Sequence, residues 1–146
     1  MLPRRLLTIA ASLALLGFAQ AAAAATMVVT KNAACVCCRE WVALMEQAGF
    51  KVFVRDMDFI APLTDQLGVP AKLRSCHVAQ IGDYVIEGHV PAEDIQRLLK
   101  QKPKAIGLAV PGMVPGSPGM NHGGQPQRYN VILFDRQGRT KLFAAH

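Results

Sequence analysis

Three of the four cysteines lie within four residues, in the segment Cys35-Val36-Cys37-Cys38. A structural disulfide stabilises most when it closes a long loop, and adjacent cysteines such as Cys37 and Cys38 bridge each other only with strain. The spacing therefore does not suit a disulfide scaffold built on distant cysteine pairs. The chain must fold around a hydrophobic core, and the sulfur cluster indicates thiol or metal chemistry.

The N-terminal residues have the composition of a secretory signal peptide. Two arginines precede an apolar run over residues 6–18, and small residues rich in alanine follow. This order predicts export with cleavage after Ala21 or within residues 22–25, and the run is too short to span a membrane. We expect residues 1–25 to be the signal peptide and residues 26–146 to form one periplasmic domain. The alternative is an uncleaved N-terminal anchor.

Hydrophobic periodicity after the leader predicts alternating strands and helices. A short β-type run leads into the cysteines, and apolar positions after Cys38 recur at helical spacing as far as Gly49. The next predicted elements are a strand over residues 51–55, a helix over 61–67, a hairpin over 75–81 and 84–88, and a helix starting at Pro91. This βαβ–ββα order predicts an α/β, thioredoxin-like fold, in which helices flank a mixed central sheet.

Two further features follow this pattern. Residues 107–127 are rich in glycine and proline and show almost no periodicity, which predicts a long loop that is either functional or disordered. Residues 129–134 and 140–143 predict a C-terminal β-hairpin. His146, at the end of the chain, is expected to be disordered.

The chemistry centres on the helix that follows the cysteines. Cys35 and Cys38 form a C-x-x-C motif at its N-terminus, where the thiolate form is favoured. Because thiolates are both redox nucleophiles and metal ligands, this motif alone leaves both roles open. Cys37 adds a third sulfur. At the start of the predicted hairpin, where thioredoxin-like redox proteins carry a cis-proline, Cys76-His77 would present a thiolate and an imidazole.

The type of ligand favours copper(I). Thiolate-rich sites select copper(I), zinc or iron–sulfur clusters, and structural zinc sites usually space their cysteines in two separated pairs. Three thiolates in four residues could instead bridge several copper(I) ions. The Gly/Pro-rich loop adds further candidate ligands, namely Met113, Met120 and His122. Core packing is the alternative for the two methionines, and His89, just before Pro91, is expected to be a helix-entry residue.

Charge and hydropathy exclude two classes of partner. The full chain carries a formal charge of +6, but its basic residues are scattered and lack the interleaved aromatic residues of a nucleic-acid interface. After signal cleavage, no segment is long and apolar enough to span a membrane. The expected partners are copper ions and other periplasmic copper-handling or electron-donor proteins.

These motifs resemble those of the CopG-like periplasmic copper-resistance family, known for long as a domain of unknown function. The resemblance covers nearly all of the chain after the leader and rests on Cys35-Val36-Cys37-Cys38 with Trp41, Ser75-Cys76-His77, Gly88-His89-Val90-Pro91, Gly107-Leu108-Ala109-Val110-Pro111-Gly112-Met113 and Gly116-Ser117-Pro118-Gly119-Met120. It implies a thioredoxin-like protein whose four cysteines, Cys35, Cys37, Cys38 and Cys76, hold a cysteine-bridged copper cluster with a redox role. One departure is Ala34, where a polar residue is expected; it removes a possible helix cap but no ligand.

Three functions remain open at this point. The first is a copper-binding protein for copper resistance, which would sequester copper or change its oxidation state. The second is a thiol–disulfide oxidoreductase, with Cys35 as the nucleophile and Cys38 as the resolving thiol. The third is a structural module stabilised by zinc or another metal cluster. Whether the protein has enzymatic turnover is not decided by the sequence.

Overall fold

The computed structural model describes residues 25–121 and 124–146, so the predicted signal peptide, apart from its last residue, lies outside the described part. The elements follow in the order β1 (Thr26–Lys31), α1 (Val36–Gln47), β2 (Lys51–Asp56), α2 (Ala61–Gln66), the 3-10 turn η1 (Ala71–Leu73), β3 (His77–Ile81), β4 (Tyr84–Glu87), α3 (Ala92–Gln101), β5 (Gly107–Ala109), β6 (Asn130–Phe134) and β7 (Thr140–Ala145). Within these residues, no helix has the length and apolar character needed to cross a membrane.

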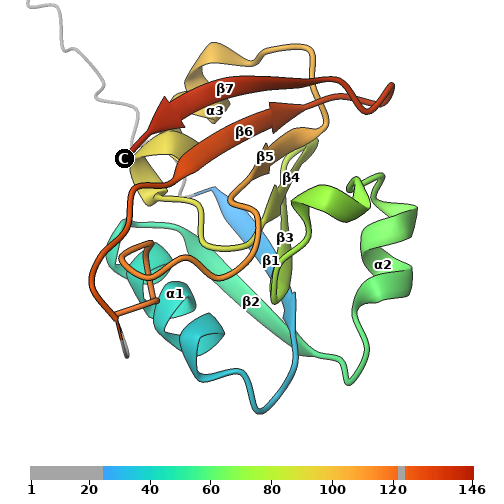
Figure 1. The fold of residues 1–146 in the computed structure, drawn as a ribbon. Coiled ribbons are helices and arrows are strands. Elements are labelled where there is room, and N and C mark those ends of the chain that lie inside the picture. The colour runs from blue at the N-terminus through green and yellow to red at the C-terminus, as the bar shows by residue number, and fades with distance from the viewer. Residues whose placement is uncertain (1–24, 122–123) are drawn as a thin grey trace, which may run out of the picture.

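The strands form one mixed sheet in the order β2-β1-β3-β4-β5-β6-β7 (Figure 1). β1 pairs with β2 in parallel, as its connection through helix α1 requires, and β4 pairs with β5 in parallel. The other neighbouring strands are antiparallel. The arrangement confirms the predicted α/β, thioredoxin-like fold, with β5, β6 and β7 added at one edge of the sheet.

Helices cover both faces of the sheet (Figure 1). α1 and α3 share one face, and their core residues are Trp41, Met45, Ile95 and Leu98. α2 and η1 lie on the opposite face over a smaller core formed by Val69, Leu73, Val78, Val85, Ala109 and Phe134. Because each helix presents one apolar stripe to the sheet, the result is a three-layer structure.

Helix α1 is built on the predicted apolar stripe. Cys38, Trp41, Val42 and Met45 are buried, at the i, i+3, i+4 and i+7 positions of one helix face. The indole N–H of Trp41 donates to the carbonyl oxygen of Val90 at 2.9 Å, which satisfies the polar atom of a fully buried side chain. The helix is thereby fixed to the connection between β4 and α3.

The predicted loop over residues 107–127 is wrong at its start, where β5 lies. Gly107, Leu108 and Ala109 are buried and pair with both β4 and β6. Three residues are too few to show a period-two pattern, so only the tertiary pairing identifies this strand. The part that follows is irregular but has internal hydrogen bonds, such as that from the Met120 N–H to the Ser117 carbonyl at 2.9 Å.

The expectation of a disordered His146 is also wrong. Its backbone exchanges hydrogen bonds with Tyr129 at 2.9 and 3.0 Å, which continues the pairing of β6 with β7. Its Nε2 lies 2.7 Å from Oδ2 of the buried Asp94 in α3. The end of the chain is therefore held by a ladder and by a side-chain contact that the sequence pattern does not show.

The close approach of β5 to β4 predicts a large effect of a single methyl group. A Cβ added at Gly107 would lie 1.7 Å from the Val85 carbonyl oxygen, which belongs to the backbone and cannot rotate away. We expect Gly107→Ala to lower the free energy of unfolding by about 3 kcal/mol. Urea denaturation of the metal-free protein measures this change. Gly124→Ala is the matched control, since its Cβ would meet only Pro115 at 3.5 Å; equal stability of the two variants would contradict the prediction.

Candidate metal and thiol site

The N-terminus of α1 is capped by a sulfur atom. Cys35 is the N-cap residue, with an extended backbone, and its Sγ accepts a hydrogen bond from the Cys38 N–H at 3.3 Å. A cap side chain satisfies one of the free N–H groups of the first turn. Ala34 precedes the cap position, so its departure from the family pattern leaves the cap intact.

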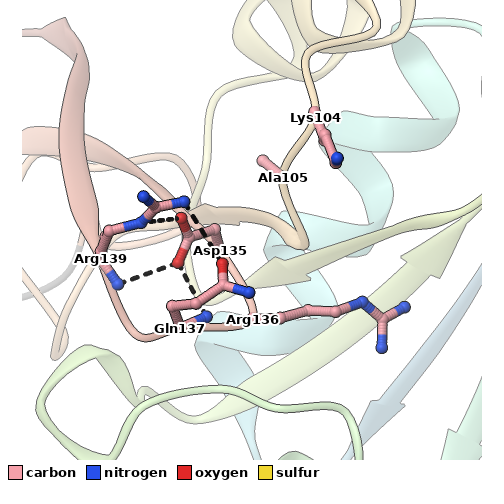
Figure 2. Close-up of a pocket in the computed structure, with 6 residues that line it drawn as sticks. All are labelled: Lys104, Ala105, Asp135, Arg136, Gln137 and Arg139. Carbon is pink, nitrogen blue, oxygen red and sulfur yellow. Dashed lines mark hydrogen bonds and ion pairs between the residues drawn. The ribbon is translucent and has the colours of Figure 1, made fainter.

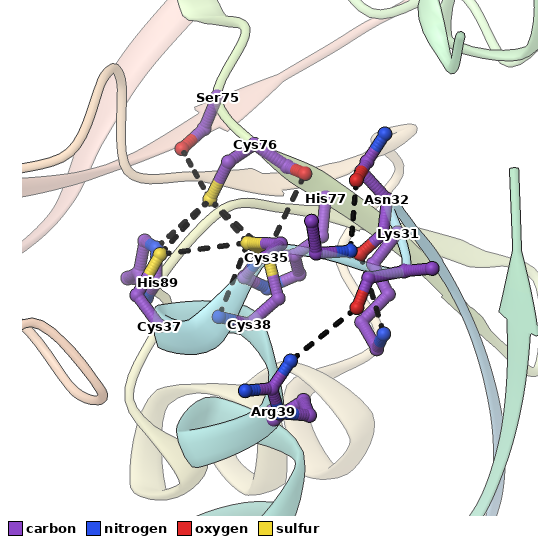
Figure 3. The surroundings of a disulfide bond; sticks show 12 residues. Lys31, Asn32, Cys35, Cys37, Cys38, Arg39, Ser75, Cys76, His77 and His89 are labelled. Carbon is purple, nitrogen blue, oxygen red and sulfur yellow. Dashed lines mark hydrogen bonds between the residues drawn. A yellow bond between two sulfur atoms is a disulfide. The ribbon is translucent and has the colours of Figure 1, made fainter. Parts of the chain in front are cut away.

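All four cysteines lie in one cluster (Figure 3). Cys35 and Cys38 are joined by a disulfide, while Cys37 and Cys76 are free thiols. The Cys76 Sγ is 3.5 Å from that of Cys38 and 3.9 Å from that of Cys37. All four sulfur atoms lie within 4.8 Å of one another, close enough to hold a metal ion.

The sheet register brings Cys76 to the other cysteines. β3 runs antiparallel to β1, and its first residue, His77, pairs with Lys31 at the end of β1. The chain enters the Cys35 turn directly after β1, while Cys76 directly precedes β3. The end of β1 and the start of β3 therefore bring together, at one end of the two strands, sulfurs that are 38 residues apart in the sequence.

Two imidazoles also lie close to the Cys76 sulfur. The Cys76 Sγ is 3.5 Å from Nδ1 of His77 and 3.0 Å from Nε2 of His89. Both histidines are fully buried, and their rings meet edge to face with centroids 4.9 Å apart. Cys76, His77 and His89 thus form a second group that could hold a metal ion.

His89 corrects the expectation of a helix-entry residue. α3 begins at Ala92 with Pro91 as its N-cap, so His89 lies before the helix and faces Cys76. A sequence signal for this contact exists in the hairpin. β3 pairs with β4 so that Val78 lies opposite Glu87, and continuing this register by two residues places Cys76 opposite His89.

Burial keeps this part of the site uncharged without metal. Desolvation, with the nearby Cys37 thiol, raises the pKa of Cys76 to about 12, so the thiol is protonated. Desolvation, with the neighbouring His89, lowers the pKa of His77 to about 3, and burial lowers the pKa of His89. Neutral imidazoles are the ligating form, whereas Cys76 must release its proton before it can bind a metal ion.

The Gly/Pro-rich loop packs against the cysteine turn. A Cβ added at Gly119 would lie 2.7 Å from the Cys37 carbonyl oxygen and 2.8 Å from the Trp41 nitrogen, so the loop backbone contacts the first turns of α1. Of the candidate ligands here, Met113 is 56 % exposed and Met120 is half-buried. His122 lies outside the described residues.

A groove of about 330 Å³ leads from the surface to the cysteines. Cys35 and Cys76 are among its lining residues, and the others are Asn32, Asp58, Phe59, Ile60, Ala61, Thr64, Arg74 and Ser75. Phe59 is 71 % exposed at its rim, and Cys38 is completely buried. Of the two disulfide-bonded residues, only Cys35 lines the groove.

A second pocket, at the turn between β6 and β7, has a different character (Figure 2). Its lining residues are Lys104, Ala105, Asp135, Arg136, Gln137 and Arg139. Asp135 accepts hydrogen bonds from the Arg139 side chain and from two backbone N–H groups, so its carboxylate is already satisfied. The pocket has no sulfur or imidazole ligand and belongs to the surface turn.

A buried carboxyl group that the sequence analysis did not single out supports the Cys76 segment. Glu87 is fully buried, and its Oε1 accepts a hydrogen bond from the Ser75 N–H at 2.6 Å, while Oε2 has no partner among the described residues. Desolvation raises the pKa of Glu87 from 4.5 to about 7, and the Ser75 N–H and Arg74 oppose this shift. The hydrogen bond ties the end of β4 to the residue before Cys76.

This carboxyl group predicts a pH dependence of folding. Because its pKa is higher in the folded state, Glu87 contributes stability that is fully present below pH 4.5 and is lost as the pH rises through 7. Glu87→Gln keeps an acceptor for Ser75 and cannot ionise. We expect the stability of the wild type, relative to this variant, to fall by about 2–3 kcal/mol between pH 4.5 and 8. Urea denaturation of both metal-free proteins tests this; a constant difference would contradict it.

Comparison with known proteins identifies the family of the chain. Residues 73–120 match a family model described as "Protein of unknown function, DUF411". No curated protein matches the chain. The solved structure "Copper resistance protein copG- Form 2" is 36 % identical, with 84 % of this chain and 98 % of that chain covered and a TM-score of 0.79. For "Copper resistance protein copG- Form 1" the identity is 37 %, the coverage is 83 % and 96 %, and the TM-score is 0.78. With this identity over almost the whole of those chains, the protein belongs to the CopG copper-resistance family.

Proposed function

We propose that the protein acts in copper resistance by holding copper(I) in a cluster bridged by Cys35, Cys37, Cys38 and Cys76. The observation that carries this proposal is the convergence of four sulfur atoms within 4.8 Å from two separate segments. Thiolates are soft ligands that favour copper(I), and two solved structures that resemble the chain are copper resistance proteins. Because a thiolate can bridge two copper(I) ions, the four sulfurs could hold several ions in one small cluster.

The disulfide supplies a link between thiol chemistry and copper chemistry. As thiols, Cys35 and Cys38 can give up two electrons and two protons to form the bond found here. These two electrons would reduce two copper(II) ions to copper(I), and the balance closes without another reactant. Renewed cluster formation then requires a reductant, namely an electron-donor protein or a dithiol of the same compartment, to restore both thiols.

The loop contributes further candidate ligands to this proposal. Met113 and Met120 offer thioethers, and His122 offers an imidazole. Gly119 brings the Met120 segment against Cys37, while a hydrogen bond from the Gly112 N–H to the Arg74 carbonyl at 3.1 Å brings the Met113 segment close to Cys76. The exposed Met113 is placed to receive copper from solvent.

A thiol–disulfide oxidoreductase is the second candidate. The specific observation in its favour is the Cys35–Cys38 disulfide at a helix N-terminus, with Cys35 on an open groove and Cys38 buried. An incoming thiolate would attack the Cys35 sulfur, and Cys38 would leave as the thiolate. Such a reaction does not need Cys76.

Replacement of Cys76 separates these two functions. We expect reduced wild-type protein to bind two or more copper(I) ions per chain without oxygen, and Cys76→Ser to lose this capacity because the remaining sulfurs come from one short segment. The copper content and the number of free thiols per chain are measured for the wild type and for the variant. Met57→Leu, which removes an exposed thioether from outside the cluster, is the control. Undiminished copper binding by Cys76→Ser would refute the cluster, and reversible reduction of the disulfide with no copper bound would favour the oxidoreductase.

We also propose that the working protein is periplasmic and lacks its leader. Arg4, Arg5 and the apolar run over residues 6–18 support export. Expression of the full chain should yield a periplasmic protein whose mass corresponds to a start between residues 22 and 26. Intact mass spectrometry of cell fractions checks this; a full-length mass in the membrane fraction would indicate the uncleaved anchor instead.

A further inference from the structure

Cys76 belongs to two groups of candidate ligands at once. One group consists of Cys76 with the sulfurs of the α1 N-terminus, and the other consists of Cys76 with the imidazoles of His77 and His89 (Figure 3). The Cys35–Cys38 disulfide removes two thiols from the first group but leaves the second group unchanged. We propose that Cys76 and the two imidazoles form a second metal site, which holds a single copper ion even in the disulfide form.

The donor set distinguishes this site from the cysteine cluster. One thiolate with two imidazoles is the set that proteins use for a single copper ion that changes oxidation state, whereas thiolates alone favour copper(I). The imidazoles add nitrogen ligands that also accept copper(II). Only the choice of copper as the natural ion rests on the proposed function; the ligand arrangement stands on its own contacts.

The separations between the ligand atoms suit a shared ion. An Sγ and a ring nitrogen that bind one tetrahedral ion, at about 2.3 and 2.05 Å, are about 3.6 Å apart. The distance from the Cys76 Sγ to Nδ1 of His77 is 3.5 Å, close to this value. The distance to Nε2 of His89 is 3.0 Å, that of a hydrogen bond donated by the thiol, and replacement of its proton by a metal ion requires an opening of about half an ångström.

The ring of His89 is already oriented for ligation. Its Nδ1 lies 2.7 Å from the Pro118 carbonyl oxygen, which only accepts hydrogen bonds, so Nδ1 carries the proton. Nε2 therefore has its lone pair towards Cys76. A backbone carbonyl that holds the second ring nitrogen is the usual support of a metal-binding histidine. Pro118 precedes Gly119, whose backbone contacts α1, so the Gly/Pro-rich loop fixes this orientation.

His77 adds an independent observation. Its ring is fully buried, 4.5 Å from the Trp41 ring between centroids, and its Nε2 has no hydrogen-bond partner among the described residues. A buried polar atom without a partner costs about 1–3 kcal/mol, so packing against Trp41 alone would favour an apolar ring at this position. Ligation through Nδ1 accounts for an imidazole at this position, but it does not supply a partner for Nε2.

The test uses cobalt(II), which binds tetrahedral thiolate and imidazole sites and does not oxidise thiols. The wild type is first oxidised to the Cys35–Cys38 disulfide, confirmed by two free thiols per chain, and is then titrated without oxygen. We expect one cobalt(II) per chain, with the absorption of a thiolate-bound tetrahedral ion. His89→Ala should weaken this binding at least tenfold. His146→Ala, which removes a histidine paired with Asp94, should bind as the wild type does.

A second measurement uses only the wild-type protein, so its result does not depend on whether a variant folds. X-ray absorption of cobalt-loaded wild-type protein should show one sulfur and two imidazole ligands. Two sulfurs without imidazole would mean that Cys37 and Cys76 hold the ion, and this would overturn the proposal, as would the absence of stoichiometric binding. Copper(I) binding by the reduced protein is measured separately. Loss of the cobalt site with an intact copper(I) cluster refutes the second site alone, and the reverse result refutes the cluster alone.

Discussion

The antiparallel pairing of β3 with β1 is the constraint on which the site depends. It places the start of β3 beside the end of β1, so that Cys76 meets the cysteines at the first turn of α1. If this register slipped by one residue, the side chains of Cys76 and His77 would each move to the opposite face of the sheet. The buried apolar residues of β1, Met27 and Val29, oppose such a slip because they would leave the core. The hydrophobic core therefore determines the geometry of the sulfur cluster.

Burial gives this cluster its electrostatic character. The Cys76 thiol and the two imidazoles lie in surroundings that disfavour charge, so each is held in its neutral form. An unpaired thiolate would be costly here, whereas a thiolate bound to a cation is neutralised. The same surroundings that suppress the free thiolate thus favour its pairing with a soft metal ion. Glu87, buried behind the same segment, adds a carboxyl group whose ionisation is disfavoured for the same reason.

The Gly/Pro-rich loop shows how an irregular segment becomes part of a site. Its backbone approaches α1 at Gly119, where a side chain would collide with Cys37, and the Pro118 carbonyl accepts the ring proton of His89. These contacts connect the loop to both halves of the ligand cluster. The buried imidazole N–H of His89 needs a hydrogen-bond partner, and the carbonyl of the adjacent loop supplies it.

The helices and most strands could be predicted because they carry strong local signals. The stripe of Cys38, Trp41, Val42 and Met45 identifies α1, and the alternating runs on both sides of the turn at residues 82–83 identify the hairpin. β5 could not be predicted, since its three residues are a strand only through pairing with β4 and β6. His89 stands between these cases. The hairpin register places it opposite Cys76, but its position two residues before Pro91 suggested a different role.

The sequence by itself determined the sulfur inventory, the order of the elements other than β5 and the type of metal that such donors select, because these depend on residue identity and local periodicity. Only the tertiary structure decided which side chains meet. The contact of Cys76 with His89, the burial of His77 against Trp41 and the hydrogen bond of His89 to the loop depend on segments distant in sequence. The distances between these side chains follow from the sheet register and the core packing. Local sequence patterns alone do not specify which strands pair.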